Sequence, residues 1–308
     1  MLEMAGTGII RIGTRGSPLA LAQANETRLR LMQAHGLEEN QFEIVVISTI
    51  GDRILNQPLA EIGGKGLFTL EIEEALQAGS IDLAVHSMKD MPAKLPDGLV
   101  FAANLPREDA RDAFVSLTAK TLQELPHGAV LGSSSVRRNA QALRIRPDLQ
   151  SVQFRGNVQT RIRKLADGVA MGTFLAVAGL NRLGLSQHIS TIMEMDEMLP
   201  AVAQGAIGIE IKTSNHRVRT LVEAIHHNTT GIAIACERAF LAKLEGSCRT
   251  PIAGHATISG DTLSFRGQIL SLDGKQSAEV SLSGPIEEAA AIGNEAAIRA
   301  VAQQNAQA

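Results

Sequence analysis

Three side chains that can do chemistry follow one expected strand, "IDLAVHS" (81–87), at its carboxyl end: Ser87, Lys89 and Asp90. In open α/β sheets, ligands bind beyond the carboxyl ends of strands. A carboxylate one residue from a lysine in a cation-rich cleft should stay ionised. Structural pairing is the commoner role of an aspartate. In this setting Asp90 is interpreted as a group that stabilises a cationic intermediate or moves a proton.

Basic and hydroxyl side chains recur at the same position after other expected strands. Helix N-termini attract anions, and arginine binds carboxylate or phosphate through two parallel hydrogen bonds. Any one of these residues alone fits a solvated surface better. Their recurrence in two blocks of the chain favours a cleft for a polyanionic ligand. They are Arg15 and Ser17, Ser135, Arg137 and Arg138 in "GSSSVRR", Arg155 and Arg161 in "FRGNVQTR", and Arg182 in "AGLNR".

The chain has two cysteines, and their settings differ. Cys236 falls on the apolar stripe of an expected helix (230–245), where a free cysteine acts as a small hydrophobe. Cys248 follows Gly246, the expected end of that helix, and stands beside Arg249, whose positive charge favours the thiolate. An incidental loop cysteine is the simpler interpretation. Facing an arginine-lined cleft, Cys248 is instead a candidate for nucleophilic attachment.

Composition narrows the classes of function. The 308 residues carry a net charge of -3 with 3% aromatics and neither Trp nor Tyr, which argues against bulk nucleic-acid binding. No apolar run is long enough to span a bilayer, and the first residues lack the basic segment of a signal peptide. Neither a phosphate loop nor Cys/His spacing for a metal is present. We expect a cytoplasmic protein without a metal.

Apolar runs alternate with longer helical stretches, which favours βα units around mostly parallel sheets. From about residue 228 the pattern changes to alternating segments between two helices, typical of a small antiparallel sheet. The sequence therefore predicts two doubly wound α/β domains facing a cleft, plus a smaller C-terminal α+β domain with an antiparallel sheet. The expected strands of the two blocks are 9–13, 42–49 and 81–87, then 129–133, 151–156, 173–179 and an apolar candidate within 199–211.

Eight ordered motifs resemble those of the porphobilinogen deaminase (hydroxymethylbilane synthase) family. The likeness covers nearly the whole chain and is weakest over the last fifty or so residues. The motifs are "RIGTRGSPLALAQ", "GGKGLF", "DLAVHSMKDMP", "REDARDAF", "GSSSVRR", "RGNVQTR", "LAVAGLNRLG" and "EGSCRTPI".

The resemblance implies a transferase of tetrapyrrole and haem biosynthesis. It would condense four porphobilinogen molecules head to tail, losing ammonia each time, onto a dipyrromethane cofactor bound to Cys248 through a thioether, and would release hydroxymethylbilane. The acetate and propionate groups of the growing chain would be the expected polyanion. The resemblance also implies a monomer with domain 1 over 1–105 and 206–225, domain 2 over 106–205 and domain 3 over 226–308.

Carried over by motif, Asp90 would be the catalytic carboxylate, contacting pyrrole N–H groups and stabilising the cation left by ammonia loss. Lys65 and Phe68 would belong to a mobile loop over the active site. Glu61, Ile50 and Ser247 depart from the family pattern, the first two making that loop less cationic. Residues implied to bind cofactor and substrate are Arg15, Ser17, Ser87, Lys89, Ser135, Arg137, Arg138, Arg155, Arg161, Arg182 and Gln204.

Two other classes of function remain open from the residues alone. A non-enzymatic anion-binding module with two α/β lobes would explain the arginines but would give Asp90 and Cys248 no role. A transferase acting on a phosphate substrate is disfavoured because the phosphate loop is missing.

Overall fold

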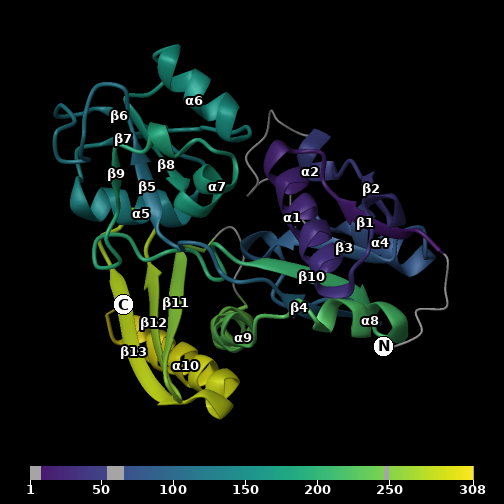
Figure 1. Ribbon diagram of the computed structural model, residues 1–308. Coiled ribbons are helices and arrows are strands. Elements are labelled where there is room, and N and C mark those ends of the chain that lie inside the picture. Colours follow the sequence, from purple (N-terminus) through teal and green to yellow (C-terminus); the bar gives the residue numbers. More distant parts are fainter. Residues whose placement is uncertain (1–7, 54–65, 246–249, 308) are drawn as a thin grey trace.

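The computed structural model describes residues 8–53, 66–245 and 250–307, which form three sheets with helices packed on them (Figure 1). The first two sheets lie side by side in the upper part of the view, and the third, in yellow-green, lies below the second. Within the described residues, no helix has the length and apolar content needed to cross a membrane.

The first sheet has the order β2-β1-β3-β10-β4, and its strands lie between helices on both faces. α1 (Pro18–His35) and α8 (His216–Glu223) cover one face, and α4 (Leu70–Ala78) covers the other. The strands are β1 (Ile10–Thr14), β2 (Phe42–Val46), β3 (Leu83–Ser87), β4 (Leu99–Asn104) and β10 (Ile207–Lys212); short helices are η1 (Glu39–Gln41), α2 (Ile50–Arg53) and η2 (Met88–Asp90).

The second sheet repeats this plan with the order β7-β6-β8-β5-β9. In each sheet one strand returns antiparallel, β10 beside β3 and β5 beside β8, so both sheets are mixed rather than wholly parallel. The elements are β5 (Asp112–Val115), β6 (Val130–Gly132), α5 (Val136–Ile145), β7 (Gln150–Val152), α6 (Val158–Ala166), β8 (Gly172–Ala176), α7 (Val177–Arg182), η3 (Ser186–His188) and β9 (Thr191–Ile192).

The third sheet is an antiparallel β11-β12-β13 meander, and α9 and α10 pack on it, as predicted for the C-terminal part of the chain. Cys236 of α9 lies in this core at 0% exposure, which confirms the prediction that it is a core residue. The elements are α9 (Asn228–Lys243), β11 (Ile252–Ser259), β12 (Thr262–Leu270), β13 (Ser277–Pro285), η4 (Ile286–Glu288) and α10 (Ala289–Gln307).

Local capping chemistry explains where the predictions succeeded. The Ser17 side chain caps α1 and Gly36 ends it with φ of 64°, as the Ser-Pro and Gly signals indicate.

Several expected strands were too long. The segment 173–179 divides into β8 and α7, 151–156 is extended only to Val152, and 199–211 becomes a strand only at Ile207. Phe68 lies just before α4.

One buried carboxylate joins the segments that run between the three sheets. Glu237 of α9 is 0% exposed and pairs with Arg107, which follows β4. Its oxygens also accept hydrogen bonds from the backbone N–H of Ala203, at 2.6 Å, and of Ala256, at 2.8 Å. Arg107 and Ala203 lie in the two segments that run between the first and second sheets, and Ala256 lies in β11 of the third sheet. The Glu237 side chain therefore links these segments to the third sheet.

Candidate active site

A small hollow, with a cavity volume of about 60 Å³, lies at the carboxyl ends of β1 and β3. Five of the predicted site residues line it: Arg15, Ser17, Phe68, Ser87 and Asp90. They come from three separate segments of the chain, so the fold brings together what the sequence spaces apart. This confirms the expected position at strand ends without testing the role of any residue.

Asp90 is exposed, yet the turn that carries it is firmly held. Met88 and Met91 on either side are 2% and 4% exposed and pack in the core that α9 and α10 share with the third sheet. Gly208 of β10 allows this packing, because a Cβ there would collide with the Met88 sulfur. The chain thus buries the neighbours of Asp90 and leaves the carboxylate facing the hollow.

The residues of the first sheet and its helices that line the hollow form what we call the first wall. Within it, Arg15 already has an ion-pair partner. Its guanidinium binds both carboxylate oxygens of Asp52 in α2 and stacks 4.2 Å from the centre of the Phe68 ring. Burial would raise the pKa of Asp52, but the hydrogen bonds from Arg15 and Thr49 outweigh it and lower that pKa. Asp52 was not identified from the sequence. It lies shortly after β2, the strand that pairs with β1, and Arg15 directly follows β1.

Two predicted hydroxyls also have structural partners. Ser17 accepts a 3.2 Å hydrogen bond from the Ala20 backbone N–H as the cap of α1. Ser87 exchanges hydrogen bonds with the amide of Gln23, at 2.8 Å from its nitrogen and 3.0 Å from its oxygen. Gln23, on α1, is a further lining residue that sequence reasoning missed.

The second sheet carries a group of arginines around a buried aspartate, which we call the second wall, and none of these residues lines the hollow. Asp112 of β5 is 0% exposed and accepts hydrogen bonds from Arg137 at 2.8 Å, Arg138 at 2.6 Å and Gln204 at 3.1 Å. Burial opposes ionisation, but the two guanidinium charges hold the pKa of Asp112 well below its usual range. Arg137 and Arg138 are therefore largely buried on an internal partner, at 5% and 6% exposure.

Lys89 connects the two walls. Its ammonium donates a 3.3 Å hydrogen bond to Gln204, which in turn donates to Asp112. Burial, followed by the positive charge of Arg138, lowers the pKa of Lys89 to about 8, although Asp90 and Asp112 act in the opposite direction. The ammonium thus lies where positive charge exceeds the negative charge available to balance it.

Arg161 lies on α6, which packs on the second sheet, and the charge of Asp90 acts on it. It donates to the Gly156 carbonyl at 2.9 Å. Burial and then the charge of Arg138 lower its pKa to about 10, with Arg155 acting in the same direction and Asp90 opposing. Arg138, Arg155 and Arg161 thus form one cationic cluster, and Asp90 is the first-wall carboxylate that acts on it. Ser135 caps α5 beside this cluster by accepting from the Arg138 N–H at 3.4 Å.

Arg182 occupies a bridging position instead of lining the hollow. It ion-pairs with Glu26 of α1 at 3.3 Å and donates to the Gly205 carbonyl at 3.1 Å. Gly205 has φ of 88° and lies against the Glu108 carbonyl, a conformation and a close approach that favour glycine. Arg182 therefore links helices of the first two sheets.

Four residues of the sequence-based expectations lie outside the described residues: Cys248, Ser247, Lys65 and Glu61. Ile50, the other departure, is the first residue of α2. Among the residues that the structure does describe, no group of three or more His, Cys, Asp or Glu side chains could hold a metal ion.

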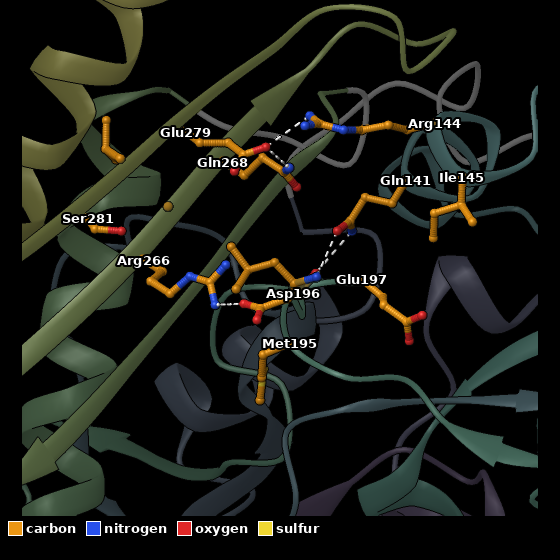
Figure 2. Close-up of a pocket in the computed structure, with 13 residues that line it drawn as sticks. Gln141, Arg144, Ile145, Met195, Asp196, Glu197, Arg266, Gln268, Glu279 and Ser281 are labelled. Carbon is orange, nitrogen blue, oxygen red and sulfur yellow. Dashed lines mark hydrogen bonds and ion pairs between the residues drawn. The ribbon is translucent and has the colours of Figure 1, made fainter.

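A larger hollow, with a cavity volume of about 370 Å³, lies between α5 and strands β12 and β13 (Figure 2). No predicted site residue lines it. Its arginines are each paired with an acid, Arg144 with Glu279 at 2.9 Å and Arg266 with Asp196. With its charges balanced in this way, the larger hollow does not show the excess of positive charge found around Lys89.

Two solved structures resemble this chain at low sequence identity. The BvgS VFT2 domain of Bordetella pertussis has a TM-score of 0.43 and 13% identity, covering 75% of this chain and 91% of that one. A periplasmic substrate-binding protein of an ABC transporter from Coxiella burnetii has a TM-score of 0.43 and 16% identity, covering 75% and 97%.

Sequence comparisons match much more closely. The family model described as "Porphobilinogen deaminase, dipyromethane cofactor binding domain" matches residues 10–220, and "Porphobilinogen deaminase, C-terminal domain" matches residues 232–302. The porphobilinogen deaminase of Paracoccus denitrificans (strain Pd 1222) is 59% identical over 288 residues, covering 94% of this chain and 92% of that protein. The chloroplastic porphobilinogen deaminase of Oryza sativa subsp. japonica is 54% identical over 286 residues, covering 92% and 80%. This chain belongs to the porphobilinogen deaminase family.

Proposed function

We propose that the hollow beside Asp90 is where this enzyme, a transferase of porphyrin and haem biosynthesis, condenses porphobilinogen. Four molecules are joined head to tail, each with loss of ammonia, onto a covalently bound dipyrromethane, and hydroxymethylbilane is released. The observation that carries the assignment of the site is the exposed Asp90 carboxylate opposite a cationic cluster on the other wall. Family membership removes the need for the two alternatives, an anion-binding module and a phosphate transferase.

The side chains around Lys89 fit a ligand that carries several carboxylates. The pKa of Lys89 is lowered to about 8 by burial and by Arg138, so an added anion would relieve an existing excess of positive charge. The pKa of Arg161 is lowered for the same reasons. Acetate and propionate groups are anions of this kind, which bind arginine and lysine through charge-assisted hydrogen bonds.

Dipyrromethane, when bound, supplies a pyrrole carbon to which the first substrate is joined. Lys89, Arg138, Arg155 and Arg161 would hold its carboxylates and those of the growing chain. Arg137 would act from behind, by holding Asp112 and the start of α5 in place. Arg15 and Phe68 would form the opposite side of the same hollow.

Asp90 is placed to act on the reacting end of the substrate. An ionised carboxylate can accept hydrogen bonds from pyrrole N–H groups and so orient the ring. The same negative charge stabilises the positive charge that develops on the substrate as ammonia leaves. Because Met88 and Met91 are buried, the carboxylate needs little reorganisation to do this.

Domain boundaries, oligomeric state and location belong to the same proposal. The inclusion of β10 in the first sheet supports a discontinuous domain 1 over 1–105 and 206–225, with domain 2 over 106–205 and domain 3 over 226–308. We expect a monomer that does not bind nucleic acid. A cytoplasmic location is supported by the bacterial relative, whereas the rice relative is chloroplastic.

Intact-mass measurement under denaturing conditions tests the cofactor assignment. The purified protein should carry the extra mass of one dipyrromethane, and Cys248→Ala should lack it. Cys236→Ala is the matched control and should keep the added mass, because Cys236 is buried and burial raises the pKa of its thiol to about 12.

Turnover of porphobilinogen to hydroxymethylbilane, followed on the same samples, tests the activity. If the purified protein carries no extra mass, it is incubated with porphobilinogen or preformed hydroxymethylbilane and measured again. A chain that gains no mass and forms no product under these conditions contradicts the proposed function. Cofactor retained by Cys248→Ala contradicts the choice of thiol.

A further inference from the structure

One buried amide on α5 has no role in the proposed mechanism. Gln141 is 3% exposed and lies beside the larger hollow. Its side chain binds both backbone polar groups of Leu199: its nitrogen donates to the carbonyl at 3.0 Å, and its oxygen accepts from the N–H at 2.7 Å (Figure 2). Because a buried polar group without a partner is costly, these two hydrogen bonds fix α5 and Leu199 relative to each other.

Leu199 belongs to a segment that is also bonded to the third sheet. Residues 193–206 run from β9 of the second sheet to β10 of the first, and we call them the crossing segment. A proline favours extended conformations of the residue before it, and Pro200 follows Leu199. The Pro200 carbonyl accepts a hydrogen bond from the Gly254 N–H of β11 at 3.0 Å. The crossing segment is thus bonded to α5 at Leu199 and to β11 at Pro200.

An arginine of the second wall binds the same Leu199 carbonyl. Arg137 donates one hydrogen bond to this carbonyl and one to Asp112, both at 2.8 Å. Asp112 in turn accepts hydrogen bonds from Arg138. All of these residues are buried, as are Pro200 and Gly254. A continuous series of buried hydrogen bonds therefore runs from β11, through the crossing segment, to Arg138.

One face of α5 contacts the crossing segment and the third sheet. Arg137, Gln141 and Arg144 lie three or four residues apart, so their side chains share that face. Arg144 forms an ion pair with Glu279 of β13 at 2.9 Å. Gly274, in the turn between β12 and β13, lies so close that a Cβ there would collide with the backbone of α5. This face is therefore held by parts of the chain outside the second sheet.

Burial separates Gln141 from the ion pair on the same face. Arg144 and Glu279 are 46% and 47% exposed, and exposed ion pairs contribute little to stability. The hydrogen bonds of Gln141 are buried, so water cannot replace them when they break. The position of α5 should therefore depend more on Gln141 than on Arg144.

We propose that Gln141 is a positioning residue for substrate binding: by holding Leu199, it fixes α5, and with it Arg138, to the crossing segment and the third sheet. This inference rests on the function proposed above, in which Arg138 holds carboxylates of the cofactor and the growing chain. Through Gln141 the third sheet helps to set the arginines of the second wall. A carboxylate that is held equally in the ground state and in the transition state contributes to KM and not to kcat.

Steady-state kinetics of the full-length enzyme separate positioning from stability. Gln141→Met removes both hydrogen bonds and nearly keeps the length of the side chain. KM for porphobilinogen should rise on the order of tenfold, with a smaller change in kcat, because α5 no longer holds Arg138 in place. Gln123→Met, at an exposed glutamine, is the matched control and should change neither constant. Wild-type kinetics of Gln141→Met, or a fall in kcat at unchanged KM, overturns the proposal.

Nuclear magnetic resonance of ¹⁵N-labelled protein follows Arg138 without any turnover. Arg138 Nε donates to Asp112 at 3.0 Å, so its ¹⁵Nε–¹H signal, identified by its loss in Arg138→Lys, reports whether that contact is kept. Gln141→Met should shift or broaden this signal. The signal of Arg11, whose Nε donates to Asp82 at 3.1 Å in the first sheet, is the internal control and should not change.

An unchanged Arg138 signal in folded Gln141→Met overturns the proposal. If Gln141→Met does not fold, the same criteria apply to Gln141→Asn, which keeps the amide on a side chain one methylene shorter. A wild-type protein that forms no hydroxymethylbilane contradicts the proposed function, and the Arg138 signal then still decides whether Gln141 positions α5.

Discussion

Two aspartates whose charges both act on Lys89 show how differently one residue type can be used. Asp90 is exposed on the first wall, in a turn whose neighbouring methionines are buried. Asp112 is fully buried under the second wall, where Arg137, Arg138 and Gln204 surround it. The comparison teaches that the carboxylate of the first wall faces the hollow, whereas the carboxylate of the second wall accepts hydrogen bonds from two arginines and holds them in place.

Removing the buried charge should have the largest effect on stability. Asp112→Asn leaves Arg137 and Arg138 without their common anion, and breaking a buried ion pair typically destabilises by about 3–5 kcal/mol. Chemical denaturation at neutral pH measures this loss. A change below about 1 kcal/mol would mean that the arginines are not held by Asp112, and would break the comparison.

That contrast was only partly predictable from the sequence. Ser17, Pro18 and Gly36 are local signals from which the bounds of α1 can be predicted, because capping depends on neighbouring residues. Asp112 lies in a four-residue strand that no pattern indicated, and its arginines follow 25 and 26 positions later. Sequence shows that Arg137 and Arg138 stand at a helix start, but it cannot show whether an internal carboxylate already occupies them.

Recurrence of basic residues did not show which of them already have an internal partner. Asp52 and Glu26 bind Arg15 and Arg182. Partners distant in sequence decide how much of a guanidinium is left for a ligand. Lys89 was assigned by motif, while its lowered pKa depends on burial and then on the charge of Arg138 from another sheet, both of which only the fold supplies.

Lys89 offers a sharper test of the second wall's excess charge. In cofactor-free Cys248→Ser protein, one lysine should titrate near pH 8, as followed by nuclear magnetic resonance of ¹³Cε-labelled lysines. The ammonium binds carboxylates only while protonated, so affinity for a pyrrole carboxylate should fall as pH rises through about 8, by up to about tenfold per pH unit.

The assignment depends on two variants. Lys89→Arg should remove the resonance that titrates near pH 8, and Lys94→Arg, which removes an exposed lysine, should leave it in place. If every lysine titrates near the ordinary value of 10.5, burial and the positive charge of Arg138 do not act together on Lys89.

The smallest effect is expected at the larger hollow, away from the cleft. Asp196 pairs with Arg266 there, and its side chain is 87% exposed. Asp196→Asn should change the free energy of unfolding by less than about 1 kcal/mol, since exposed ion pairs contribute little. Turnover should not change either. A loss as large as that of Asp112→Asn would show that exposure does not separate structural from solvated aspartates in this chain.

The central claim, that Asp90 serves chemistry while Asp112 serves structure, is tested most directly by measuring kcat and the free energy of unfolding of Asp90→Asn. We predict that kcat falls by about 10²–10⁴-fold, and that stability stays within about 0.5 kcal/mol of wild type. Asp97→Asn, at another exposed aspartate, is the matched control and should change neither quantity. Near-normal turnover by Asp90→Asn, or a stability loss comparable to that of Asp112→Asn, would contradict the account.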